Sequence, residues 1–270
     1  MIDDSLTIFA TPKAFERHIG QAQRNAIGSW KSVFPRARLI LMGDDAGTAE
    51  ASREFGALYI PQIARNEFNT PLLRSVFELA HKEAGGGLML YVNADIILTS
   101  DLRQAIEALP AMEQFLLVGQ RTDMYVRYAI DFGALDWEQV LRRRAAIKGK
   151  AAGPKAIDYF VFPHGLFASV PNFAIGRGWW DHWLLAEAQR RRASIIDATA
   201  SVLAVHQNHD YHASEEALRN LALFGMGSKE ISLHMAGQQI RGGRLQPRDR
   251  LEEGFRRRLR RWLHNRLMPE

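Results

Sequence analysis

The sequence of 270 residues contains no cysteine, which excludes disulfides, thiolate zinc sites and cysteine nucleophiles and suits a reducing compartment. It also lacks any run of about 18 apolar residues, so we expect no membrane-spanning helix. The most apolar stretches, around Leu88–Leu98 and Ile195–Val205, are interrupted by Asn93, Asp95 and Asp197. The opening MIDDSLTIFA carries two acids and no basic segment. We therefore expect no secretory signal and a cytoplasmic protein.

Several common ligand motifs are missing as well. The turn after the first expected strand reads Thr11-Pro12-Lys13, so it has no GxGxxG, and neither GxxxxGK[ST], HExxH nor GxSxG occurs. These absences disfavour a classical dinucleotide site, a P-loop and the common hydrolase sites. A nucleotide diphosphate bound here would have no glycine-rich cradle. Its charge would need a hard divalent cation, Mg²⁺ or Mn²⁺, held by carboxylates, with imidazole as a further ligand for Mn²⁺.

Positive charge is concentrated at the end of the chain. The net charge is +5, and residues 241–270 hold ten arginines against four acids, so residues 1–240 sum to −1. A near-neutral body and the absence of any nucleic-acid motif argue against binding of nucleic acid. Residues 250–270 have the pattern of a basic amphipathic helix, with an apolar face of Phe255, Leu259, Trp262, Leu263 and Leu267. Such a helix either lies on an anionic membrane surface, making the protein peripheral, or packs on the body.

Short apolar runs alternate with helical patterns, which predicts an α/β protein with a mixed, mostly parallel sheet flanked by helices. We expect one domain over residues 1–240 and a basic extension over 241–270. Basic and glycine residues in Arg142–Pro154 predict an exposed, mobile loop that closes as a lid. The expected strands are residues 6–10, 38–42, 58–60, 88–92, 115–119, 157–162, 195–196 and 202–205. The expected helices lie near residues 23–33, after Thr70-Pro71 and Ser100 as starting residues, and from Trp180.

Polar residues follow three of these strands, at Thr11-Pro12, Asp44-Asp45 and Asn93–Asp95. Each aspartate alone is explained as a turn residue. Together they favour a shared crevice, because the carboxyl ends of parallel strands meet at one edge of a sheet. Asp95 is the preferred metal ligand. His206 directly follows an apolar strand, so we prefer it to His209 as a second ligand, with a satisfied core histidine as the alternative.

The segment from Gly176 to Asp181 is a further candidate. Asp181 lies in the first turn of a helix, where the helix dipole stabilises an ionised carboxylate that can accept a proton from a hydroxyl group. Arg177 and Trp180 are candidates for acceptor binding. The alternative for the tryptophan is a core position, since Trp180 and Trp183 fall on the inward stripe of that helix.

The order of motifs resembles that of GT-A nucleotide-diphospho-sugar transferases. The resemblance spans residues 6–212 and rests on the segments FATPKAF, LILMGDD, NEFNTPLL, LYVNADIIL, LVGQRTD, DYFVFP, IGRGWWDHWLL and IIDATASVLAVHQNHDY. It implies a GT-A fold and a metal-assisted glycosyltransferase that moves a sugar from a nucleotide-sugar donor to a glycan or lipid-linked acceptor, as in polysaccharide biosynthesis. Sugar-nucleotide pyrophosphorylases share this architecture, but their glycine-rich start is absent.

The resemblance also implies roles for individual residues. Asn93-Ala94-Asp95 takes the place of the DxD motif, whose last acid binds the metal. The other implied roles are donor binding by Thr11, Pro12, Asp44 and Thr70, metal binding by His206, and, as in inverting members, a base at Asp181. The family also includes retaining enzymes, so the resemblance leaves the stereochemistry open. Asn93 departs from the motif and removes one negative charge. This departure leaves a non-catalytic nucleotide-sugar-binding protein as the alternative.

Overall fold

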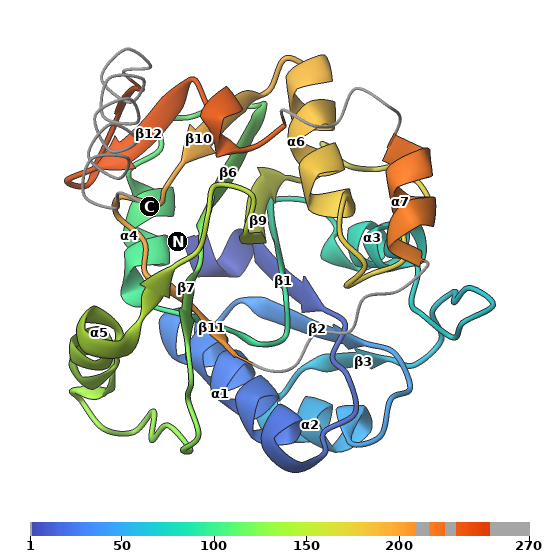
Figure 1. Ribbon diagram of the computed structural model, residues 1–270, viewed down its shortest axis with the longest axis vertical. Helices are drawn as coiled ribbons and strands as arrows, with labels where there is room; N and C mark the ends of the chain where they lie inside the picture. Colours follow the sequence, from blue (N-terminus) through green and yellow to red (C-terminus); the bar gives the residue numbers. More distant parts are fainter. Residues whose placement is uncertain (1, 209–215, 225–230, 249–270) are drawn as a thin grey trace, which may run out of the picture.

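The computed structural model describes residues 2–208, 216–224 and 231–248 as two β-sheets with helices packed around them (Figure 1). The helices are α1 Arg17–Val33, α2 Thr48–Phe55, α3 Leu73–Ala84, α4 Ser100–Glu107, α5 Trp137–Lys148, α6 Trp180–Arg190 and α7 Glu216–Phe224, with 3₁₀ turns η1 Ile2–Ser5 and η3 Leu233–Met235. The strands are β1 Leu6–Ala10, β2 Arg38–Met42, β3 Leu58–Ile60, β4 Leu88–Val92, β5 Ile96–Leu98, β6 Phe115–Gln120, β7 Thr122–Met124, β8 Lys150–Ala151, β9 Ile157–Pro163, β10 Ser194–Asp197, β11 Ala204–Gln207, β12 Gln238–Arg241 and β13 Arg244–Pro247.

The larger sheet has the order β13-β12-β10-β6-β9-β4-β1-β2-β3. Strands β4, β1, β2 and β3 pair in parallel, so their carboxyl ends lie at one edge. β9 runs antiparallel between β4 and β6, and β13 runs antiparallel to β12. The α/β architecture with a mostly parallel sheet is confirmed, and the polar residues that follow β1 and β4 are brought side by side.

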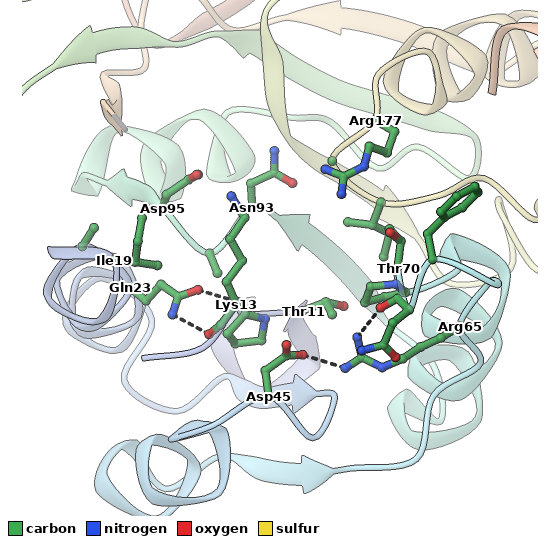
Figure 2. Close-up of a pocket in the computed structure, with 18 residues that line it drawn as sticks. Thr11, Lys13, Ile19, Gln23, Asp45, Arg65, Thr70, Asn93, Asp95 and Arg177 are labelled. Atoms are coloured by element: carbon green, nitrogen blue, oxygen red, sulfur yellow. Dashed lines mark hydrogen bonds and ion pairs between the residues drawn. The ribbon is translucent and has the colours of Figure 1, made fainter. Parts of the chain in front are cut away.

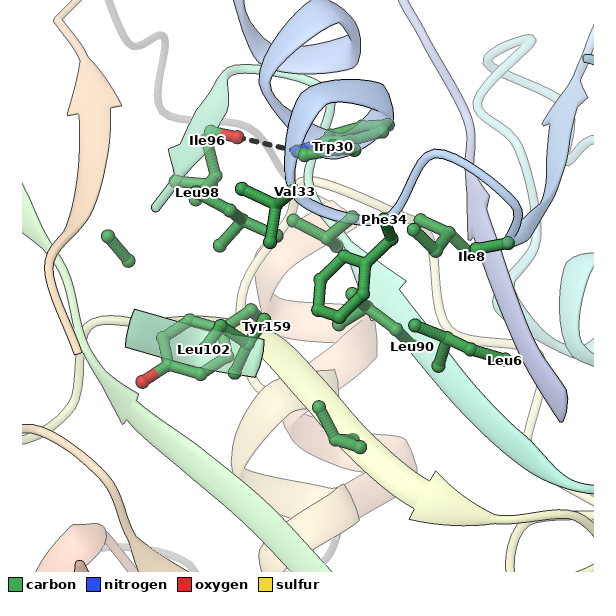
Figure 3. Close-up of a cluster of buried hydrophobic side chains, with 14 of the residues drawn as sticks. Leu6, Ile8, Trp30, Val33, Phe34, Leu90, Ile96, Leu98, Leu102 and Tyr159 are labelled. Carbon is green, nitrogen blue, oxygen red and sulfur yellow. Dashed lines mark hydrogen bonds between the residues drawn. The ribbon is translucent and has the colours of Figure 1, made fainter. Parts of the chain in front are cut away.

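Two hydrophobic cores cover the two faces of this sheet, because successive side chains of a strand point to opposite sides. Ile8 joins the core beneath α1 and α4, whereas its neighbour Phe9 joins the core beneath α3 and α6. Figure 3 shows part of the first core, in which the indole of Trp30 donates a hydrogen bond of 2.8 Å to the carbonyl of Ile96. That bond fixes α1 against β5, directly after the Asn93–Asp95 turn.

The smaller sheet, in the order β5-β11-β7-β8, is covered by α5, and this part differs from the sequence prediction. We predicted a mobile lid over Arg142–Pro154, but residues 142–148 are the second half of α5. Leu141 and Ala145 are the buried residues of this helix. The Arg142 guanidinium pairs with Asp101 at 2.7 Å and with Glu138 at 3.0 Å. The prediction of a solvated loop rested on basic residues, and one of them, Arg142, instead connects the helix to Asp101.

Two expected helix starts are also wrong by one or two residues. α3 begins at Leu73 with Leu72 as its N-cap, because the backbone N–H of Leu72 bonds to Ala64 instead of continuing the helix from Thr70. The N-cap of α4 is Thr99, and Ser100 is its first helical residue. Both shifts leave the amphipathic faces of the helices as the sequence predicted.

The C-terminal part of the described chain adds the β12–β13 hairpin to the edge of the larger sheet. This hairpin continues to Pro247, so the expected boundary at residue 240 falls within it. The predicted basic amphipathic helix over 250–270 lies outside the described residues. Among the described helices, none combines the length and apolar character needed to cross a membrane.

Candidate active site

A cavity of about 460 Å³ opens at the carboxyl ends of β1 and β4 (Figure 2). Its walls come from the segments after these strands, from α1, and from two loops on the opposite side. The lining residues are Thr11, Pro12, Lys13, Ile19, Ala22, Gln23, Asp45, Arg65, Phe68, Asn69, Thr70, Pro71, Asn93, Ala94, Asp95, Ile175, Gly176 and Arg177. The structure thus brings together Thr11, Pro12, Thr70, Asn93, Asp95 and Arg177 from the predicted set.

Asp44 is not among the lining residues, and its neighbour Asp45 is. The Asp44 side chain is 71% exposed and its carboxylate lies 2.8 Å from the Arg65 guanidinium, which also binds Asp45 at 2.6 Å. Gly43 permits the turn because its φ of 108° is unfavourable for other residues. The expected donor contact of Asp44 therefore fits Asp45 better, since only that carboxylate faces the cavity.

Side chains fix the backbone of two segments that line the cavity, one at Lys13 and one at Asn69. The Gln23 amide receives a hydrogen bond from the Lys13 N–H at 2.7 Å and donates one to the Lys13 carbonyl at 2.8 Å, so it holds the segment after β1 against α1. The Arg65 guanidinium donates to the Asn69 carbonyl at 2.9 Å. The cavity wall opposite α1 is therefore preorganised by its own hydrogen bonds.

Asp95 meets the late histidine, as the sequence predicted. His206 is 1% exposed, its Nε2 lies 3.6 Å from an Asp95 carboxylate oxygen, and its Nδ1 lies 2.9 Å from Asp123. Burial by itself lowers the pKa of His206, but the adjacent Asp95 carboxylate outweighs burial and raises that pKa above its usual value. When Nδ1 carries a proton and donates it in a hydrogen bond to Asp123, Nε2 is the ring nitrogen that faces Asp95.

A buried carboxylate, that of Asp158, lies next to Asn93. The Asn93 amide donates a hydrogen bond of 2.6 Å to Asp158, which also accepts one of 2.7 Å from Arg121. Arg121 in turn lies 2.9 Å from Asp123. Burial raises the pKa of Asp158, and Arg121 opposes this only partly. The Asn93 amide therefore donates a hydrogen bond to Asp158, whereas an aspartate at position 93 would place a second carboxylate against it.

Sequence reasoning missed Asp123 and Asp158. Asp123 lies on β7, and the parallel register of β7 with β11 sets it opposite His206. Asp158 lies on β9, and the N–H of Asn93 bonds to its carbonyl. Both were visible in the quoted segments LVGQRTD and DYFVFP. Their contacts depend on strand pairings across 83 and 65 positions of the chain, which local patterns do not reveal.

Asp95 and His206 fit a divalent cation as a pair. Across the described ranges, no group of three or more His, Asp or Glu side chains is arranged to hold a metal ion. Two ligands each about 2.1 Å from one cation lie roughly 3.0 Å apart at right angles and roughly 4.2 Å apart when opposed. The measured 3.6 Å falls between these limits. Asp95 lines the cavity, whereas His206 is buried behind it and is not among the lining residues. Mg²⁺ commonly binds one or two carboxylates and takes its other ligands from phosphates and water, so the Asp95 carboxylate is the ligand that such an ion would meet from the cavity.

The loop before α6 carries Arg177 into the cavity but leaves Asp181 outside its lining. The Arg177 guanidinium pairs at 2.5 Å with Glu216 of α7, and the Asp181 carboxylate lies 3.0 Å from Nδ1 of His182. Trp180 is 3% exposed and packs on Tyr91, with the ring centroids 5.3 Å apart. This burial argues against the predicted acceptor contact of Trp180 and supports the alternative of a core position.

The architecture is that of the GT-A glycosyltransferase fold. The structure is similar to Staphylococcus aureus TarS residues 1–349, solved with UDP-GlcNAc, at a TM-score of 0.51, 12% identity and coverage of 81% of this chain. It is also similar to the mannosyltransferase PcManGT from Pyrobaculum calidifontis, solved with GDP-Man and Mn²⁺, at a TM-score of 0.50, 14% identity and coverage of 86% of this chain.

These similarities concern the fold. The chain spans 65% of the TarS fragment and 70% of the mannosyltransferase chain. No protein-family model and no curated protein matches the sequence. The expectation of a GT-A fold, stated from the order of the motifs, is confirmed by the structural comparison.

Proposed function

We propose that the protein is a glycosyltransferase that moves a sugar from a nucleotide-diphosphate donor to a hydroxyl acceptor. The observation that carries this proposal is the Asp95 carboxylate, which lines a cavity at the carboxyl ends of parallel strands and has the buried His206 3.6 Å behind it. Proteins of similar fold were solved with UDP-GlcNAc and with GDP-Man, which supports a donor of this class.

The cavity offers different chemistry at its two sides, as Figure 2 shows. Asp45 and Arg65 line one side, where a carboxylate and a guanidinium can bind the polar groups of a nucleoside. Arg177 and Lys13 line the same space and supply positive charge for a diphosphate. We therefore place the nucleoside toward the end of β2 and the diphosphate toward Asn93–Asp95.

Asp95 and His206 would hold a Mn²⁺ or Mg²⁺ ion. When bound, the ion neutralises negative charge on the leaving nucleoside diphosphate. Asp123 keeps His206 in the tautomer that presents the Nε2 lone pair, because it accepts the proton of Nδ1 at 2.9 Å. Arg177, held by Glu216, adds a fixed positive charge at the same wall of the cavity.

Asp181 remains our candidate for the base that takes the proton of the acceptor hydroxyl. It lies in the first turn of α6, four positions beyond the cavity-lining Arg177, and its side chain is 15% exposed. The hydrogen bond with His182 orients one carboxylate oxygen. An acceptor would then enter along the loop that precedes α6, and attack on the anomeric carbon would invert its configuration. We propose a glycan or a lipid-linked saccharide as that acceptor.

The test is a thermal-shift screen of UDP- and GDP-sugars with and without Mn²⁺, followed by an assay of sugar transfer or donor hydrolysis. We expect one donor to raise the melting temperature in a Mn²⁺-dependent way, because it binds only the folded state. Asp95→Ala and His206→Ala should remove that dependence, whereas Glu113→Ala, at an exposed position before β6, should keep it. Asp181→Asn should bind the donor but not transfer. If Asp95→Ala and Asp181→Asn both transferred sugar at the parent rate, the proposal would be wrong.

A nucleotide-sugar-binding protein without transferase activity is the second candidate. It is favoured by Asn93, whose amide is engaged with Asp158 and brings no negative charge to the metal side of the cavity. The same experiment separates the two functions. A donor that raises the melting temperature but is neither hydrolysed nor transferred with any acceptor would support the binding protein.

A further inference from the structure

A second cavity, of about 440 Å³, lies between α5 and the segment that follows β7. Its lining residues are Met124, Tyr125, Arg127, Tyr128, Arg144 and Lys148, and we call it the basic groove. No acidic residue lines it. In the part of the chain that the structure describes, Arg127, Arg144 and Lys148 form no ion pair with a carboxylate, unlike Arg142, two positions before Arg144.

The arginines of the basic groove are held by aromatic rings. The Arg144 guanidinium carbon lies 4.1 Å from the centre of the Tyr128 ring, and that of Arg127 lies 5.4 Å from the centre of the Tyr125 ring. Stacking on a ring fixes the plane of a guanidinium and leaves its N–H donors available. Two preoriented guanidinium groups beside an ammonium group form a site for phosphate oxygens.

Apolar side chains are exposed next to these cations. Ile147 is 81% exposed, one position before Lys148 and on the outward side of α5, and Tyr125 is 65% exposed. Leu135, directly before α5, is fully exposed. A soluble phosphate ester would neutralise the cations but leave these apolar groups in water. An anionic bilayer satisfies both, because its headgroups carry phosphate and its interior accepts apolar side chains.

We propose that the basic groove and Ile147 dock on the surface of a membrane that contains anionic phospholipids. Lipid phosphates bind Arg127, Arg144 and Lys148, while Ile147 and Tyr125 enter the region between headgroups and acyl chains. The residues of this surface lie between positions 124 and 148 of the sequence and include none of the Arg-rich residues 249–270. The proposal does not rest on sugar transfer, because it concerns binding alone.

The absence of cysteine allows a local test on the full chain. Ile147→Cys, labelled with an environment-sensitive fluorophore, is mixed with vesicles of phosphatidylglycerol and phosphatidylcholine, or of phosphatidylcholine alone. Lys82→Cys is the matched control, since Lys82 is exposed on α3, which lies across the molecule from α5 (Figure 1). We expect a blue shift of the label at position 147 with anionic vesicles only, and no shift at position 82.

A charge reversal tests the cations separately. Lys148→Glu should lower the vesicle partition coefficient by on the order of tenfold, because each basic residue near an anionic surface contributes about a fivefold factor. Lys82→Glu makes the same change of net charge away from the groove and should leave the partition coefficient nearly unchanged. No shift of the label at 147 on vesicle-bound protein would overturn the proposal. An equal shift with soluble glycerol phosphate, or equal partition of the Lys148→Glu and Lys82→Glu variants, would also overturn it.

Discussion

Replacing Asn93 by aspartate tests whether the amide at this position is required by the buried Asp158. The change restores the first acid of a DxD motif, but it sets two carboxylates against each other where a donor and an acceptor now lie 2.6 Å apart. A hydrogen bond to a charged group contributes about 1.5–3 kcal/mol. Two carboxylates that share a site cannot both ionise freely, so one pKa rises. We expect a loss of about 3 kcal/mol in the free energy of unfolding at pH 8.

The pH dependence distinguishes this cause from a simple loss of packing. In Asn93→Asp the folded state holds a carboxyl group whose pKa is raised above the unfolded value of about 3.9. The folded variant therefore binds more protons than the unfolded chain between these two pKa values, and its stability falls as the pH rises through that range. The deficit relative to the parent should be largest at pH 8 and smaller at pH 5.

The assay is thermal and urea-induced unfolding in metal-free buffer at pH 5 and pH 8. A loss of 3 kcal/mol corresponds to a decrease of roughly 6–12 °C in Tm for a chain of about this size. Asn93→Ala is the control, because it removes the hydrogen bond to Asp158 without adding a charge, so its deficit should be smaller at pH 8 and should change less between pH 5 and pH 8. An Asn93→Asp variant as stable as the parent at pH 8, or one with the same deficit at both pH values, would refute the reasoning.

Three further changes test other contacts. Trp30→Phe should lower the free energy of unfolding by about 2–3 kcal/mol in urea titrations, because the carbonyl of Ile96 loses its donor and a cavity forms; an unchanged urea midpoint would contradict this. Tyr159→Phe should be neutral or stabilising by about 1 kcal/mol in the same assay, since the buried hydroxyl has no hydrogen-bond partner among the described residues; a loss above that size would show a hidden partner. Glu216→Gln should weaken donor binding about fivefold in calorimetric titrations by loosening Arg177, while Glu67→Gln, at an exposed pair with Arg219, should not.

Several strands of the larger sheet could be predicted from the sequence, though not β12 and β13. For β1, β2 and β4 the reason is burial on both faces, which makes these strands nearly continuous apolar runs. Residues 6–10, 38–42, 58–60 and 88–92 match β1 to β4 to the residue. Such runs need no partner to be recognised, since their composition alone separates them from surface elements. The polar residues that follow β1 and β4 could be predicted for the same reason, and this located one wall of the cavity.

Elements whose stability comes from distant partners could not be predicted in this way. α5 buries little more than Leu141 and Ala145 and is anchored by Arg142 to Asp101, 41 positions earlier in the chain. Its sequence therefore resembles a basic loop, and the helix is stabilised by tertiary contacts, the packing of Leu141 and Ala145 and the Arg142–Asp101 pair, which local pattern does not reveal. The same limit applied to the groups around His206. The sequence placed His206 just after an apolar strand, whereas the structure has it inside β11, and Asp123 reaches it through the pairing of β7 with β11. Sheet register determines that Asp123 is the acid that orients His206. Such an acid can be recognised only after the strand pairing is known, and the chemistry of the site is inferred from that pairing.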